Sequence, residues 1–175
     1  HIPLTKIRLN QFNRTSLDKY TTLVMVSGSY NQISESGIKK IKDWVSKGNT
    51  LITIGSASSW AIKKEVVKES LVETKNDTIF SRKRYIDARE YSGRERIGGS
   101  ILKVDLDLTH PLAFGYRDQS IPVYKNNNVF LNKSKSDYSS VAIYSKNPHI
   151  DGYVSKKNME NNLKGAASLI VSSSG

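Results

Sequence analysis

The sequence predicts an α/β domain whose sheet is mostly parallel and which carries a β-rich insertion in its second half. Three observations lead to this prediction. Residues 23–26 and 50–54 are short apolar runs of the kind that form strands buried on both faces. Residues 34–48 between them have helical periodicity. The second half of the chain is rich in short segments typical of strands.

The segment between the two apolar runs has the signals of one complete helix. Ser34 is a suitable N-cap, Glu35 lies in the first turn, where the helix dipole favours negative charge, and Gly48 follows the last turn as a stop. One helical face carries the apolar side chains Ile38, Ile41, Trp44 and Val45. The resulting strand–helix–strand unit predicts parallel neighbouring strands joined by a right-handed crossover.

The flanking elements have weaker signals. Residues 4–9 alternate between apolar and polar side chains and predict a strand, and residues 59–71 predict a helix behind the Gly55 turn. Residues 73–99 are polar and predict a long excursion with a short helix over 84–91.

The second half is predicted to add several strands and one helix. The asparagine triplet 126–128 is typical of a hairpin turn, because asparagine tolerates positive φ. A helix is expected over 155–163, with Ser155 as its cap and Gly165 as its stop. The expected strands are 100–106, 121–124, 129–131, 141–144 and 166–171.

Composition narrows the classes of function. The 175 residues fit one domain over 1–175, without an apolar run long enough for a membrane span. The absence of cysteine excludes disulfides, thiolate metal sites and a cysteine nucleophile. The net charge of +11 is spread mostly over helix surfaces, and no nucleic-acid-binding motif accompanies it. A denser basic group, Arg82 to Arg96, leaves an anion-binding module as an alternative.

Several segments together resemble a known family. They are Val26 to Tyr30, Trp44 to Gly48, Thr50 to Trp60, Gly98 to Ser100, Asp107 to Tyr116 and Gly152 to Ser155. In combination they are similar to the C-terminal region of secreted bacterial zinc carboxypeptidases of the carboxypeptidase A-like family. That region resembles a class I glutamine amidotransferase domain with a flavodoxin-like sheet in three layers.

The resemblance implies a non-catalytic accessory domain in a secreted or periplasmic protein. Its partner would be a peptidase domain of the same polypeptide, which would hold the zinc. A first strand and helix are then expected upstream of Ile2, and the chain is expected to be cut at or near its end as well. No cofactor or metal is expected within 1–175, because His-x-x-Glu and paired-histidine spacings are absent and no phosphate-binding loop follows a strand.

The same resemblance identifies the position at which an amidotransferase carries its cysteine nucleophile. That position is Ser56, and Ser27 to Ser29 match the loop that supplies an oxyanion-hole amide. A serine there needs a positioned base. His149, with Asp151 two residues later, supplies the only His-x-acid spacing, so a serine hydrolase or amidase built on Ser56, His149 and Asp151 is an alternative.

The plainer interpretation assigns structural roles to the same residues. Ser56 or Ser58 would cap the helix that starts near Ser59, and His110 would make a structural hydrogen bond beside Pro111. Ligands of α/β proteins bind at the carboxyl ends of the strands, so a peptide or carbohydrate ligand is expected there. The candidate ligand-binding residues are Gly28, Ser29, Tyr30, Ser56, Ser58, Trp60, Arg94 and Arg96.

Overall fold

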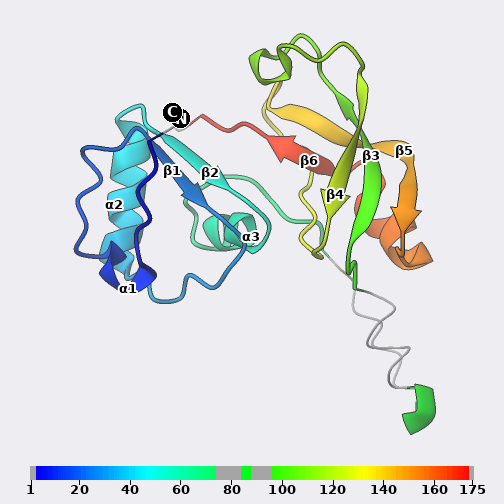
Figure 1. Cartoon of the computed structure of the whole chain (residues 1–175), viewed down its shortest axis with the longest axis horizontal. Coiled ribbons are helices and arrows are strands. Elements are labelled where there is room, and N and C mark those ends of the chain that lie inside the picture. Colours follow the sequence, from blue (N-terminus) through cyan, green and yellow to red (C-terminus); the bar gives the residue numbers. More distant parts are fainter. Residues whose placement is uncertain (1–2, 74–83, 88–95, 174–175) are drawn as a thin grey trace. The chain divides into compact units, whose positions relative to one another are not determined.

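The computed structural model describes residues 3–73, 84–87 and 96–173, and the chain divides into two compact units (Figure 1). The N-terminal unit comprises residues 1–68 with 173–175, and the C-terminal unit comprises residues 69–172. The first contains a two-stranded parallel sheet and the second a four-stranded antiparallel sheet curled into a half-barrel. The predicted three-layer, flavodoxin-like parallel sheet is therefore wrong.

The N-terminal unit is a strand–helix–strand unit with flanking helices. Its elements are α1 (Leu9–Phe12), β1 (Thr22–Met25), α2 (Glu35–Ser46), β2 (Thr50–Thr53) and α3 (Ser56–Lys63). Strands β1 and β2 are parallel, with Leu23 opposite Leu51 and Val24 opposite Ile52. The predicted parallel pairing is confirmed. Within the described ranges, α2 and α3 are the only substantial helices.

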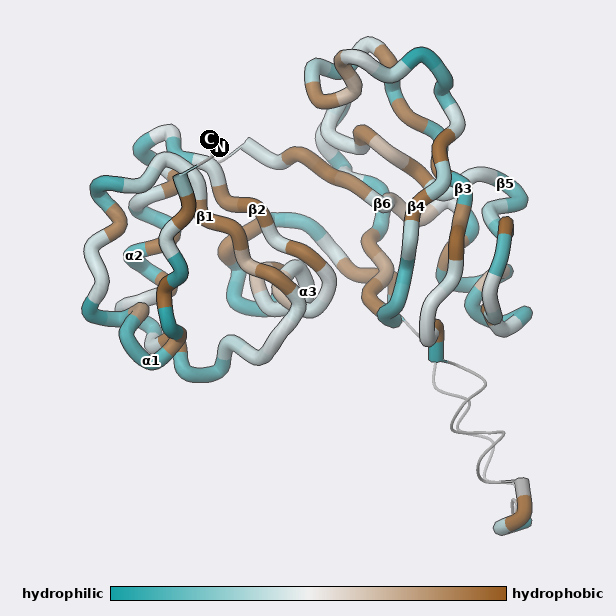
Figure 2. Tube along the Cα trace, viewed as in Figure 1, coloured by the Kyte–Doolittle hydropathy of each residue, from teal (hydrophilic) through white to brown (hydrophobic). Residues whose placement is uncertain are grey.

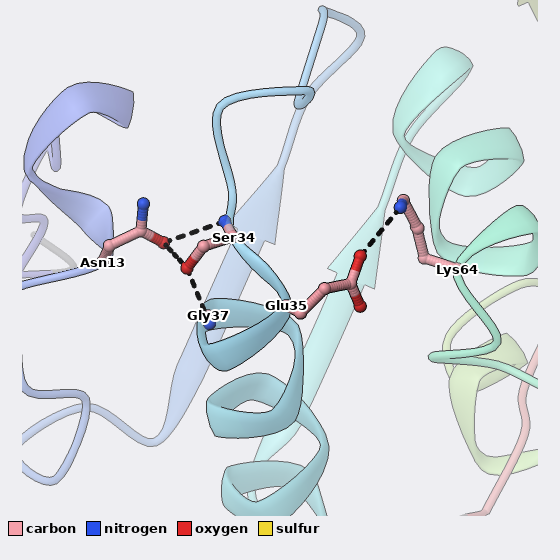
Figure 3. A network of polar contacts seen from close by, with 5 residues as sticks. All are labelled: Asn13, Ser34, Glu35, Gly37 and Lys64. Carbon is pink, nitrogen blue, oxygen red and sulfur yellow. Dashed lines mark hydrogen bonds and ion pairs between the residues drawn. The ribbon is translucent and has the colours of Figure 1, made fainter.

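Helix α2 begins with the predicted cap, which a second segment reinforces (Figure 3). The Ser34 hydroxyl oxygen accepts a hydrogen bond from the main-chain N–H of Gly37 at 3.2 Å. Asn13 Oδ1 accepts from both the N–H and the hydroxyl of Ser34, at 3.2 and 3.1 Å. Glu35, in the first turn, forms an ion pair of 3.1 Å with Lys64. The start of α2 is thus fixed from two sides.

One face of the small sheet packs against α2 and α3, and the other does not. The buried core of this unit consists of Phe12, Leu17, Met25, Ile33, Ile38, Ile41, Trp44, Ala57, Trp60 and Ala61. On the opposite face of the strands, Val24 and Ile52 are 48% and 43% exposed, and Val26 and Ile54 at the strand ends are 59% and 51% exposed. Figure 2 shows both strands as largely hydrophobic. The sequence pattern predicts strands buried on both faces, but within this unit helices cover only one face of the sheet.

Two predicted elements of the N-terminal unit are corrected. Residues 4–8 form no strand, and no described strand pairs with this segment. Helix α1 begins at Leu9, and the side chains of Ile7 and Leu9 pack against the core. The helix predicted over 59–71 is α3, which starts earlier, at Ser56, and stops at Lys63. It stops because Glu65 adopts a left-handed conformation, with φ of 54°.

The C-terminal unit is built from antiparallel strands. They are β3 (Ser100–Leu106), β4 (Ser120–Lys125), β5 (Ser140–Gly152) and β6 (Ala167–Ile170), in the order β4-β3-β5-β6. Three short helical turns accompany them: η1 (Tyr85–Asp87), η2 (Pro111–Ala113) and the π-helical η3 (Asn158–Leu163). The core of the unit includes Ile97, Leu102, Val104, Leu106, Phe130, Ala142, Tyr144, Leu163 and Ala166.

The curl of this sheet has a local cause. The pairing of β3 with β5 shifts register on either side of Leu102, and such irregularities bend strands and increase their twist. The strand predicted over 100–106 is confirmed by β3. The predicted hairpin around 126–128 is wrong, because β4 pairs with β3 and Leu131 forms only single bridges, with Leu71 and Ala167.

Candidate functional site

The turn between β2 and α3 is where the sequence predicts a reactive residue. Ser56 is the first residue of α3, and its Oγ lies against the loop that follows β1. It accepts a hydrogen bond from the main-chain N–H of Gly28 at 2.8 Å and donates to the Gly28 carbonyl oxygen at 2.9 Å. The Ser27 hydroxyl lies 3.1 Å from Ser56 Oγ and accepts from the Ser56 N–H at 3.2 Å. Ser56 therefore ties the two strand ends together.

The strained residue of this turn is Gly55. Its φ of 59° and ψ of −121° are accessible to glycine and costly for other residues. In a nucleophile elbow the reactive side chain sits on the strained strand-to-helix residue itself, which aims it out of the turn. Here that residue has no side chain, and Ser56 stands one position later, inside the helix. The turn has the form of an elbow without a group at its apex.

The predicted capping role of the serines is corrected. Helix α3 has Gly55 as its N-cap residue, and no side chain caps it, because the helix starts at Ser56 rather than near Ser59. Ser58 Oγ instead lies 3.0 Å from Thr53 Oγ1 on the preceding strand. Both Ser56 and Ser58 therefore bind α3 to strand residues or to the loop after a strand.

Two aromatic ligand-binding candidates pack beside this turn. The rings of Tyr30 and Trp60 are 5.7 Å apart and tilted by 47°. The Tyr30 hydroxyl donates to the carbonyl oxygen of Val26, and burial raises the pKa of Tyr30. Trp60 is 8% exposed, and its indole N–H has no hydrogen-bond partner in the part of the chain described. Gly28 and Ser29, the other candidates on this loop, are exposed.

The predicted histidine–aspartate pair lies at the end of β5, in the C-terminal unit. His149 Nε2 is 2.6 Å from the Gly152 carbonyl oxygen, and the Gly152 N–H donates to Asp151 Oδ1 at 2.8 Å. Both residues therefore bind Gly152, the last residue of β5. Ser56 belongs to the N-terminal unit, so the proposed triad would combine residues of two units. It stays a prediction.

The structural role predicted for His110 is confirmed. Its Nδ1 accepts a hydrogen bond from the Leu112 N–H at 3.1 Å and caps η2. Just before it, Asp107 Oδ1 accepts from the Thr109 hydroxyl at 2.6 Å and from the Thr109 N–H at 2.9 Å. These hydrogen bonds from Thr109 lower the pKa of Asp107. This segment is a compact polar turn.

The basic group is only partly described. Arg82, Lys83 and Arg94 lie outside the described residues, while Arg84 and Arg96 are exposed. Among the residues with a described position, no group of three or more histidine or acidic side chains could hold a metal ion. No helix within the same ranges has the length and apolar character that crossing a bilayer requires.

One chemically unusual residue was not predicted. Lys125, the last residue of β4, is 6% exposed, and burial lowers its pKa to about 8. The signal was available, because Ile121, Val123 and Lys125 alternate with polar or exposed residues and so share the inner face of the strand. Its Nζ donates to the Val129 carbonyl oxygen at 2.6 Å.

No protein-family model matches this chain, and the comparisons with curated proteins and with solved structures find no match either.

Proposed function

We propose that this chain is a non-catalytic accessory domain of a secreted or periplasmic zinc carboxypeptidase, in which it packs against the peptidase domain of the same polypeptide. The observation that carries the non-catalytic part is the β2–α3 turn. Its strained position is Gly55, and the neighbouring Ser56 hydroxyl is already hydrogen-bonded to the Gly28 loop. The zinc carboxypeptidase part rests on the resemblance of segments such as Asp107 to Tyr116.

A packing role is supported by the uncovered face of β1 and β2. It carries Val24, Val26, Ile52 and Ile54, each about half exposed. Burying four half-exposed aliphatic side chains would contribute about 4 kcal/mol. This is at the lower limit of the roughly 4–15 kcal/mol that two free molecules lose in entropy when they associate. A neighbour on the same polypeptide avoids most of that loss, so the face suits a covalently linked domain better than a free partner.

The serine-hydrolase alternative keeps one observation in its favour. The Gly28 N–H points at Ser56 Oγ, as an amide of an oxyanion hole would lie near a nucleophile. Against it, no histidine lies between residues 3 and 68, the part of the N-terminal unit that surrounds Ser56. A histidine base would have to come from outside that segment.

A fluorophosphonate probe, which labels activated serines, separates the two functions. We expect no label on Ser56 and no turnover of chromogenic esters or of glutamine. Ser56→Ala should lower stability by about 1 kcal/mol through its lost hydrogen bonds. Ser58→Ala, on the same helix, is the matched control. Labelling that disappears in Ser56→Ala, persists in Ser58→Ala and falls in His149→Ala would refute the non-catalytic proposal.

The carboxypeptidase context has a separate test. The coding sequence on either side of this chain in its natural gene is expected to encode, in frame, a domain with a His-x-x-Glu zinc motif and a second, distant histidine. A different enzyme or no peptidase in that position would refute this part and leave the question of Ser56 untouched.

A further inference from the structure

An open groove of about 550 Å3 lies in the N-terminal unit, between residues 13–18 and the outer face of α2. Its charged lining consists of Arg14, Asp18, Lys39, Lys40, Asp43 and Lys47, which are four cations and two carboxylates. None of these residues belongs to the β2–α3 turn. The groove is therefore a separate feature from the candidate site above.

The two walls of the groove are joined by specific contacts. Lys40 Nζ reaches from α2 across to the opposite wall and donates to the carbonyl oxygens of Phe12 and Thr15, at 2.7 and 2.8 Å. The same Nζ lies 4.7 Å from the centroid of the Phe12 ring. Asn13 is held against Ser34, as Figure 3 shows. Because the chain's own contacts hold both walls in place, the groove is preorganised, which reduces the entropy that binding must overcome.

Three exposed charged side chains on the α2 wall of the groove have no partner within the described ranges. Lys39 and Asp43 belong to α2 and Lys47 is its C-cap residue; all three line the groove, and within the described ranges their side chains make no hydrogen bond or ion pair. The Arg14 side chain, on the opposite wall, likewise makes no hydrogen bond or ion pair within the described ranges. The result is a row of positive, negative and positive charge along one wall, with a further cation facing it.

The spacing of this row matches an extended peptide. Residues four apart in a helix are separated by about 6 Å along its axis. Alternate residues of an extended strand project to the same side about 6.6 Å apart. A strand lying along α2 can therefore place three alternate side chains opposite Lys39, Asp43 and Lys47. Complementary charge requires an acidic, a basic and an acidic side chain in turn.

The aromatic content of the groove disfavours nucleic acid. Trp44 is the single aromatic residue in the lining, and it is only 4% exposed. Single-stranded nucleic acids are usually held by bases stacked on accessible aromatic rings. Such a platform is missing from this groove, whereas charge spacing alone suffices for a peptide.

We propose that the groove binds an extended peptide segment in which acidic, basic and acidic residues alternate with small ones. The two acidic side chains contact Lys39 and Lys47, the central basic side chain contacts Asp43, and Arg14 contacts the peptide from the other wall. Recognition depends on the order of the charges and not only on their sum. This inference is independent of the proposed accessory function.

Two synthetic peptides of identical composition test the order of charges. They are blocked at both ends and have the sequences Glu-Ser-Lys-Ser-Glu and Lys-Ser-Glu-Ser-Glu. Amide chemical shifts of the labelled chain, followed up to millimolar peptide, give both affinities. We expect the first peptide to bind about fivefold more tightly and to shift α2 and residues 13–18, because exposed ion pairs contribute about 0.2–1 kcal/mol each.

Variants of exposed residues sharpen the test. Asp43→Lys should abolish the preference, because each peptide then places two glutamates and one lysine opposite a row of three lysines. Lys47→Gln should weaken binding of the first peptide about threefold, and Lys63→Gln, on α3 and outside the groove, should leave it unchanged. Equal affinities of the wild type for the two peptides, a preference that persists in Asp43→Lys, or no shifts at millimolar peptide would overturn the proposal.

Discussion

Replacing Lys125 with methionine tests whether the half-barrel contains an ammonium group that is costly to bury. The residue is 6% exposed, and its Nζ donates to the Val129 carbonyl oxygen at 2.6 Å and to Asn127 Oδ1 at 3.2 Å. It also lies 4.8 Å from the centroid of the Phe130 ring. No acidic side chain within the described ranges forms an ion pair with it. Its charge is thus compensated only by dipoles and a ring.

The pKa of Lys125 sets the magnitude and the sign. Burial lowers this pKa from 10.5 to about 8, which corresponds to about 3 kcal/mol at about 1.4 kcal/mol per pH unit. Below pH 8 the group is protonated in both states, so the folded state bears the full penalty. Between pH 8 and 10.5 only the unfolded chain keeps the proton, and the free energy of unfolding therefore rises with pH.

Urea unfolding of the wild type and of Lys125→Met, followed by far-ultraviolet circular dichroism, measures this effect. From neutral pH to pH 10.5 the stability of the wild type relative to the variant should rise by about 3 kcal/mol. Both tryptophans, Trp44 and Trp60, lie in the N-terminal unit, so their fluorescence reports on a unit that the substitution should leave unchanged. Lys103→Met, at an exposed position of β3, is the matched control.

Two outcomes would refute the reasoning. One is a stability difference between wild type and Lys125→Met that stays constant across this pH range. The other is an NMR titration in which the Lys125 ammonium loses its proton near 10.5, because a group that titrates normally carries no burial penalty.

The N-terminal unit yields two further predictions, both checked by urea unfolding followed by tryptophan fluorescence or circular dichroism. Trp44→Phe should lower the free energy of unfolding by about 1–2 kcal/mol more than Trp60→Phe does. The Trp44 indole N–H donates to two carbonyl oxygens at 3.0 and 3.1 Å, whereas that of Trp60 has no partner in the described chain. Equal losses would contradict this reasoning. Gly37→Ala should destabilise α2 by about 1–3 kcal/mol despite the higher helix propensity of alanine, because its Cβ would meet Asn13 Oδ1 at 2.5 Å. Lys39→Ala on the exposed face should be neutral or stabilising, and a neutral Gly37→Ala would show that Asn13 can move aside.

The parts of the fold that the sequence predicted are those with local causes. Ser34 caps α2 and Gly48 follows it in a left-handed conformation, while Ile38, Ile41 and Trp44 are buried on one face. Each of these signals acts over a few residues. The parallel pairing of β1 and β2 followed from the same unit, because a crossover helix of this length leaves few other arrangements.

The arrangement of the remaining strands has no such local cause. Alternation in residues 100–106 indicates which side chains face inward, but not whether the neighbouring strand is parallel or which segment supplies it. Residues 121–124 were expected to pair across the asparagine triplet with 129–131. Instead β4 pairs with β3, and Lys125 Nζ binds the Val129 carbonyl oxygen.

The sequence indicated the turn between β2 and α3 but not which of its residues is strained. A strand, a glycine and a serine before a helix indicate a tight turn, yet they do not reveal which residue takes the strained conformation. In the structure Gly55 has the strained conformation, and the Ser56 hydroxyl is hydrogen-bonded to Gly28 where a nucleophile would be exposed.

The groove could not be read from the sequence for a different reason. Lys39, Asp43 and Lys47 have the pattern of an ordinary solvated helix face, and nothing near them in the chain distinguishes them. They line a groove because Lys40 binds carbonyl oxygens 25 to 28 residues earlier in the chain and so holds a second wall in place. The order of the charges can affect affinity only when two walls hold the ligand in one orientation. If the peptides distinguish that order, the recognition arises from a tertiary contact that leaves no motif in the sequence.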